Sequence, residues 1–322
     1  KRDHISPALA RAVLPMRVYE TGAPQMALRD RANALTFHIE AARAKAPPAA
    51  RDVLQAENEL KFFDRVAQFR GPAGTTRIDV ALLAPLKKNL VKKIRESRKD
   101  TLNLTLNLEF SAMLRDEKFE PLVKNQSASP LAVKLAAREK FSNAVGHVSL
   151  LARPQNAELA LQVQEKQREK TGYNRRLFQI RDFSARTKLL LSDIQLHYRA
   201  KNDVQKKILP AVHYPDFTVS PYPFYEIRKK EPVLVYFEIY NIRSAGMGES
   251  MRISYTISSI KGNKASVDVS FTRPALSDNM HELVEIDLKN VKKGWNRLKV
   301  SVSSLQDSTI QAVAQKKISV KE

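Results

Sequence analysis

The sequence predicts a mainly β protein, in which two tandem immunoglobulin-like β-sandwich domains follow an N-terminal α-helical segment. Two observations predict the sandwiches. Apolar and polar residues alternate in many short segments, which is the period of a half-buried strand. Turn residues separate these segments at intervals of roughly 8–12 positions, a spacing typical of β-sandwiches. A third observation, apolar residues at helical spacing near the N-terminus, predicts the helices.

Length and composition limit the kind of protein. The 322 residues have room for two or three domains, and 43% of them are hydrophobic, which is enough for real cores. The absence of cysteine excludes disulfides, zinc–thiolate sites and thiol catalysis. No apolar run reaches the roughly 18 residues that a membrane-spanning helix needs. Because the chain begins at Lys1, without a methionine or an apolar signal, we expect it to be part of a longer protein.

Residues 1–70 are predicted to form an α-helical hairpin that docks onto a neighbouring subunit. Met26–Ala46 consists mainly of good helix formers, with apolar residues at near-helical spacing. The proline pair at 47–48 ends this helix and can begin a second one. The second helix is predicted to run to about Gln68 and to place Phe63 in its apolar stripe.

Residues 71–199 are predicted to form the first β-sandwich domain. The turn at Gly71–Gly74 breaks the helix, and alternation begins after it. Within residues 101–110, five apolar residues occupy alternate positions, which makes this the clearest strand of the chain. Pro130–Asn143 is predicted as a short amphipathic helix or as an insertion between strands. Further strands are predicted at 148–151, 159–164 and 177–180.

The second β-sandwich domain is predicted over residues 232–322, after a linker at 200–231 that is rich in proline and aromatic residues. Its first two strands flank a loop at 241–249. In the first of them, the odd positions of 233–239 fall on one face and the even positions of 234–240 fall on the other. Further strands are predicted at 267–271, 283–288, 298–302 and 310–320.

Five segments occur in a consistent order within residues 60–322: Phe69–Val80 with Pro85, Leu191–Leu196, Val235–Asn241, Leu283–Leu288 and Gly294-Trp295. In this order they resemble the β domains of bacterial GWxTD-domain proteins. The first two segments resemble the opening of the first β domain and the strand that follows it. The other three resemble the second β domain.

The box that names this family is missing, because Gly294-Trp295 continues as Asn296-Arg297-Leu298. The chain therefore resembles the accompanying sandwich region without the GWxTD box. The resemblance implies a bacterial envelope or exported protein. We expect the chain in the periplasm or peripherally at the cell envelope, and a lipid anchor in a segment upstream of Lys1 is one means of attachment. The resemblance implies no established activity and assigns no functional residues.

The motifs of common enzyme classes are missing from the sequence. No nucleophile elbow, Walker loop or dinucleotide fingerprint is present. His281-Glu282 resembles the start of a zinc-protease box, but the second histidine is absent and the segment is predicted as a strand. Asp193 is expected to cap a turn or to pair with an arginine. We therefore expect no enzyme, no cofactor and no metal site.

An aromatic cluster in the proline-punctuated linker is the candidate partner-binding site. Prolines preset an extended backbone, and aromatic rings supply large contact areas with polar groups. Packing between the domains, a docking surface for a partner protein and a sugar-stacking platform are the three interpretations. Trp295, by contrast, is expected to anchor a core. The cluster consists of Tyr214, Phe217, Tyr222, Phe224 and Tyr225.

The formal net charge is +21, from 55 lysines and arginines against 34 aspartates and glutamates. Such an excess favours acidic partners. The densest basic run is either a solvated face or a polyanion-binding site, and it lacks the aromatic residues that stack on bases. It consists of Lys87, Lys88, Lys92, Lys93, Arg95, Arg98 and Lys99.

The leading hypothesis for function is a non-catalytic structural or scaffold subunit of a bacterial envelope or exported assembly. It would act through protein–protein contacts of its sandwiches and N-terminal helices. The alternative is a basic polyanion-binding module for nucleic acid, acidic glycan or an anionic lipid surface.

Overall fold

The computed structural model describes residues 60–85, 101–136, 143–165, 170–198, 210–214, 216–224, 226–261 and 265–322. These residues form β-strands, connecting loops and one short 3₁₀ turn, which confirms the predicted mainly β class. None of the described helices is long and apolar enough to cross a membrane. The helices predicted within residues 1–59 and the basic run at 87–99 lie outside the described residues.

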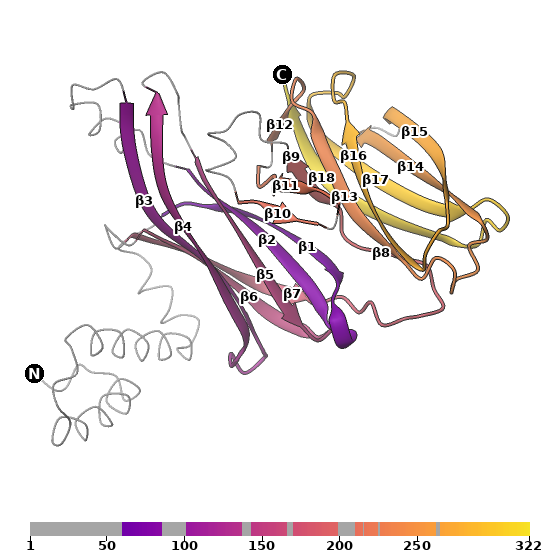
Figure 1. Cartoon of the computed structure of the whole chain (residues 1–322), viewed down its shortest axis with the longest axis horizontal. Helices are drawn as coiled ribbons and strands as arrows, with labels where there is room; N and C mark the ends of the chain where they lie inside the picture. The colour runs from indigo at the N-terminus through magenta and orange to yellow at the C-terminus, as the bar shows by residue number, and fades with distance from the viewer. Residues whose placement is uncertain are drawn as a thin grey trace, which may run out of the picture.

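Two antiparallel sheets make up the first sandwich, drawn in indigo to pink in Figure 1. One sheet has the order β1-β2-β5 and the other has the order β4-β3-β6-β7. The strands of the first are β1 (Phe63–Arg70), β2 (Thr76–Pro85) and β5 (Asn143–Ala152). The strands of the second are β3 (Thr101–Arg115), β4 (Pro121–Ala136), β6 (Asn156–Glu165) and β7 (Lys170–Gln179).

Alternate residues of the two sheets enclose the core of the first sandwich. Ile78, Val80 and Leu82 enter it from β2, while Phe110 and Leu114 enter it from β3, and all five are fully buried. This alternation is the pattern that predicted the strands. The predicted strands at 76–82, 101–110, 148–151 and 159–164 are therefore confirmed.

The second sandwich, which runs from red through orange to yellow in Figure 1, also consists of two sheets. One has the order β10-β11-β9-β13-β16, with β8 pairing β13, and the other has the order β12-β18-β17-β14-β15. The first comprises β8 (Leu190–Leu191), β9 (Gln195–Tyr198), β10 (Val212–His213), β11 (Thr218–Pro221), β13 (Val233–Tyr240) and β16 (Asn279–Ile286). The second comprises β12 (Glu226–Arg228), β14 (Ser250–Ser259), β15 (Ala265–Pro274), β17 (Gly294–Ser304) and β18 (Gln311–Lys321).

Strand β13 has two buried faces. Its odd positions, Val233, Val235 and Phe237 among them, join the core of the second sandwich, as the alternation predicted. Its even positions face the first sandwich, and there Tyr236 is 2% exposed and Tyr240 is 3% exposed. Because both faces of β13 are buried, this strand contacts the core of the second sandwich on one face and the first sandwich on the other.

The structure differs from the prediction in the segment before Gly71. Phe63–Arg70, expected at the end of a helix, forms β1 and pairs with β2 along its whole length, from Phe63↔Leu83 to Arg70↔Thr76. Residues 130–136, expected as a helix or an insertion, belong to β4. In both segments the apolar residues are spaced in a way that also suits a helix, and pairing with a neighbouring strand decides in favour of β-structure.

The predicted linker contributes to the second sandwich. Residues 212–213, 218–221 and 226–228 form β10, β11 and β12 at the margins of its sheets. β8 and β9, which the sequence assigned to the first domain, both pair with β13. Proline lacks an N–H donor and is tolerated on such marginal strands, as at Pro221.

Candidate functional site

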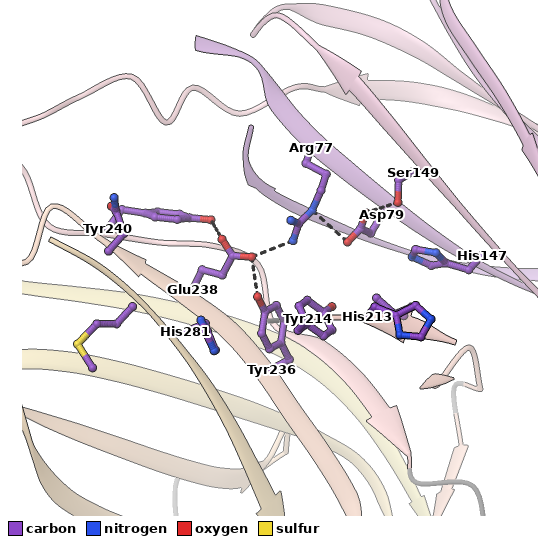
Figure 2. A pocket seen from close by; sticks show the side chains of 13 residues that line it. Arg77, Asp79, His147, Ser149, His213, Tyr214, Tyr236, Glu238, Tyr240 and His281 are labelled. Carbon is purple, nitrogen blue, oxygen red and sulfur yellow. Dashed lines mark hydrogen bonds and ion pairs between the residues drawn. The ribbon is translucent and has the colours of Figure 1, made fainter. Parts of the chain in front are cut away.

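A cleft of about 380 Å³ lies between the two sandwiches. The first sandwich lines it with side chains of β2 and β5, and the second with side chains of β10, β13, β16 and adjoining residues. Most of these side chains are charged, phenolic or imidazole groups (Figure 2). The lining residues are Arg77, Asp79, His147, Ser149, Val212, His213, Tyr214, Tyr236, Glu238, Tyr240, Asn279, Met280 and His281.

Glu238 is the centre of the polar contacts in this cleft. It lies on β13 between Tyr236 and Tyr240, on the same face of the strand. Its Oε1 accepts hydrogen bonds from the Tyr236 hydroxyl at 2.7 Å and from the Arg77 guanidinium at 2.8 Å. Its Oε2 accepts one from the Tyr240 hydroxyl at 2.7 Å. Both carboxylate oxygens are thus occupied, as the dashed lines in Figure 2 show.

Arg77 joins the first sandwich to this carboxylate. Its Nε lies 3.3 Å from Oδ2 of Asp79, whose other oxygen accepts a hydrogen bond from the Ser149 hydroxyl at 2.7 Å. Burial lowers the pKa of Arg77, but the charges of Asp79 and Glu238 outweigh it and raise the pKa above its ordinary value. The guanidinium therefore stays charged, and it lies 4.5 Å from the centre of the Phe69 ring.

Arg70, the last residue of β1, also reaches the second sandwich. Its two terminal nitrogens donate to the side-chain oxygens of Asn279 at 3.0 Å and Asn241 at 2.9 Å. Its backbone N–H donates to the Tyr240 hydroxyl at 2.8 Å, and its guanidinium lies 4.4 Å from the Tyr240 ring centre. The Tyr240 hydroxyl therefore accepts from one sandwich and donates to Glu238 of the other.

Asp193 makes a further polar contact between the sandwiches. It lies between β8 and β9, and its Oδ1 accepts from Arg181 at 2.7 Å. Its Oδ2 accepts from the backbone N–H of Gln68 at 3.0 Å, and its own N–H donates to the Gln68 carbonyl at 3.0 Å. The expectation that Asp193 pairs with an arginine is confirmed.

Aromatic rings fill the apolar part of this interface. The Phe69 ring of β1 lies 5.6 Å from the Tyr236 ring, and these two residues form a buried cluster with Ala67. Tyr214 and Phe217 cover the cluster, with ring centres 4.1 Å and 5.9 Å from that of Tyr236. Two of the aromatic residues singled out in the sequence thus contribute to packing between the sandwiches.

Two other members of the aromatic cluster belong to the core of the second sandwich. Tyr222 is 7% exposed and belongs to the core of the second sandwich, and Phe224 packs against the same core. Tyr225 and the basic residues from Lys87 to Lys99 lie outside the described residues.

Four histidines lie in or beside the cleft. His197, on β9, is completely buried, and its Nε2 lies 3.3 Å from the Tyr214 hydroxyl. Burial, followed by the charge of His147 across the interface, lowers the pKa of His197 to about 3. Burial also lowers the pKa of His147. His281 lies on a strand, as predicted, with its Nε2 3.0 Å from Oδ2 of Asp216.

These contacts suit the site to holding the two sandwiches together. Burial and the charge of Glu238 raise the pKa of Tyr236 and Tyr240, so both hydroxyls remain donors at neutral pH. Both oxygens of the Glu238 carboxylate are used by these three hydrogen bonds, two of which come from its own strand and one from the first sandwich. Among the described residues, no group of three or more His, Asp or Glu side chains could hold a metal ion.

Trp295 does not have the predicted role. Its side chain is 53% exposed, at the start of β17, instead of anchoring a core. Leu298, Val300 and Val302 of the same strand enter the core. Because alternate residues of a strand face opposite ways, an odd-numbered residue of β17 points outward.

The sequence patterns do not predict a functional role for Arg77 and Glu238, the two residues at the centre of the interface. One signal was available, because Glu238 is a single charged residue within an otherwise apolar and aromatic strand. Buried carboxylates require a charged or hydrogen-bonding partner. The partner itself lies 161 positions away along the chain, and no local pattern identifies it.

No protein-family model matches this chain, and no curated protein matches it. Among solved structures, it is similar to dimeric latent PorU from Porphyromonas gingivalis, with 11% identity and a TM-score of 0.27 over 84% of this chain and 21% of that one. It is also similar to Escherichia coli alpha-2-macroglobulin activated by porcine elastase, with 12% identity and a TM-score of 0.21 over 82% and 22% of the two chains. The chain spans about a fifth of each of these proteins. Similarity at this level identifies no function.

Proposed function

We propose that this chain is a non-catalytic structural subunit of a bacterial cell-envelope or exported assembly. Its two immunoglobulin-like sandwiches act as one unit that binds partner proteins. The polar interface around Glu238 supports this proposal, because it fixes one sandwich against the other through charged groups from both. The resemblance to the β domains of GWxTD-domain proteins supports the location in the periplasm or envelope.

The observation that carries the proposal is the open edge at β15. Among the described residues this ten-residue strand pairs with β14 alone, and none of its residues is buried. Val269, at its centre, is 52% exposed. Edge strands of this length present unpaired backbone donors and acceptors, and native proteins usually protect them with lysine or proline. Between Ala265 and Thr272, β15 carries one charged residue, Asp268.

Such an edge fits the addition of a strand from a partner protein. In this mode the backbone hydrogen bonds supply affinity, and alternate side chains supply specificity. Arg273, near the end of β15, pairs with Glu282 of the opposite sheet with N–O distances of 3.2 Å. This ion pair holds the end of the strand in place for a partner.

Replacing Val269 with lysine is expected to reduce partner recovery by about tenfold, because a lysine on an edge strand opposes pairing with another chain. The measurement is quantitative recovery of bound proteins with the tagged full chain expressed in its native host. Val313→Lys is the matched control, since Val313 is 45% exposed on β18 of the same sheet. Equal recovery with Val269→Lys and Val313→Lys would exclude β15 as the docking edge.

A second candidate function is the binding of an anionic polymer or surface. It is favoured by exposed cations at one end of the second sandwich that form no ion pair among the described residues.

A further inference from the structure

One end of the second sandwich displays apolar and basic side chains together. Trp295 is 53% exposed and Ile260 is 40% exposed. The backbone N–H of Ile260 donates to the Trp295 carbonyl at 3.2 Å, so the two residues lie on adjacent strand ends. Four exposed cations lie nearby: three are within three residues of Trp295 along the chain, and one is on the paired strand β18. We call this group the Trp295 end; it consists of Ile260, Lys292, Lys293, Trp295, Arg297 and Lys317.

Strand register places the cations beside the tryptophan. Arg297 follows Trp295 by two positions on β17 and therefore lies on the same face of the sheet. Lys317 of β18 is directly opposite Arg297, which brings their Cβ atoms to about 5 Å from each other. Lys292 and Lys293 immediately precede Gly294 in the turn that leads into β17.

The turn that carries the two lysines is held firmly. Val291, which is 1% exposed, anchors its start in the core. The buried Asn296 side chain donates to the carbonyls of Lys292 at 2.8 Å and Gly294 at 2.9 Å. Gly294 has a φ of +103°, a conformation that favours glycine. The lysines are thus presented outward from a fixed backbone.

The four cations have no charged partner among the described residues. Two acidic residues near this end have other partners: Asp287, which precedes Lys292 along the chain, pairs with Lys289, and Glu226 of the adjacent strand β12 pairs with Lys321. In the part of the chain that the structure describes, Lys292, Lys293, Arg297 and Lys317 form no ion pair. An anionic partner would therefore meet uncompensated positive charge.

The combination fits an anionic lipid surface better than a nucleic acid or a glycan. Tryptophan is enriched at the interface between headgroups and acyl chains, and an exposed isoleucine gains free energy when it is buried there. Single-stranded nucleic acid is usually bound in a groove with several stacking rings, whereas one exposed ring lies at this end. Each lysine or arginine near an anionic membrane contributes about a fivefold gain in affinity.

We propose that the Trp295 end docks this protein peripherally onto a membrane surface that contains anionic phospholipid. Trp295 and Ile260 enter the headgroup boundary, and the four cations contact lipid phosphates. This surface uses none of the residues of β15, so it is independent of the strand-addition role.

Trp295 is the chain's one tryptophan, so its fluorescence reports contact with lipid directly. Adding vesicles that contain phosphatidylglycerol to the full chain is expected to shift the emission to the blue, and lipids brominated on their acyl chains are expected to quench it. Vesicles of phosphatidylcholine alone are expected to leave the emission unchanged. Replacing Lys292 and Lys293 together with glutamate is expected to weaken binding at least about 30-fold.

Lys118→Glu with Lys188→Glu is the matched control, because it makes the same change of net charge at exposed lysines elsewhere in the chain. The control is expected to bind as the wild type does. The inference is overturned if both double variants lose the same affinity, since charge alone would then explain binding. It is also overturned if the emission responds to a single-stranded oligonucleotide and not to anionic vesicles.

Discussion

Glu238→Gln is expected to lower the free energy of unfolding by about 2 kcal/mol, because it leaves the partly buried Arg77 without its charged partner across the interface. The amide offers one acceptor where the carboxylate accepts three hydrogen bonds, and its NH₂ group is a donor facing other donors. The measurement is thermal and denaturant unfolding of the full chain at pH 7.5.

Glu285→Gln is the control for this substitution. Glu285 lies on the neighbouring strand β16, is exposed and forms no side-chain hydrogen bond or ion pair among the described residues, so its loss is expected to change stability by less than about 0.5 kcal/mol. Combining Glu238→Gln with Tyr240→Phe is expected to cost less than the sum of the two single changes, because they remove a shared hydrogen bond. Equal stability of Glu238→Gln and Glu285→Gln would refute the role assigned to this interface.

Acidification from pH 7.5 to 5 is expected to lower the free energy of unfolding by about 2 kcal/mol through His197 alone. The pKa of this buried imidazole is about 3 in the folded protein, against an ordinary value of 6.5. Between these two values the unfolded chain binds a proton that the folded chain does not. The contribution of His197 to the free energy of unfolding is therefore fully present above about pH 6.5 and declines as the pH falls towards 3.

His197→Phe is expected to remove this part of the pH dependence, since phenylalanine keeps a ring against Tyr214 and Tyr236 without a titrating group. His147 of the first sandwich and Lys316 also act on the His197 charge, and both oppose its protonation. The measurement is the unfolding free energy at pH 7.5 and 5 for the wild type, His197→Phe and His213→Gln, whose histidine is exposed. An unchanged difference between the two pH values in His197→Phe would contradict this assignment.

The strands of both sandwiches could be predicted where one face is apolar and the other polar. The pattern at 101–110 and the two-faced strand at 233–240 are examples, and the loop at 241–249 separates β13 from β14 as expected. β1 was not predicted, because the i, i+3 spacing of Phe63 and Val66 also suits a helix. The pairing with β2 decides between the two, and that is a tertiary contact.

The candidate site could be predicted only in part. The even-numbered face of β13 was recognised as a separate face, but nothing local indicates that it lies against another sandwich. Tyr214 and Phe217 were singled out for their composition, and packing between the domains was one of their three interpretations. The position of Trp295 was predictable from strand parity, because Leu298 and Val300 fix the inward positions of β17.

The most direct test of the scaffold function is the native mass of the full chain purified gently from its source over a series of rising salt concentrations. We expect a multi-protein particle of fixed stoichiometry that persists as salt rises, because strand addition depends on backbone hydrogen bonds and apolar contacts. A free monomer that releases nucleic acid or acidic glycan as salt rises would contradict it.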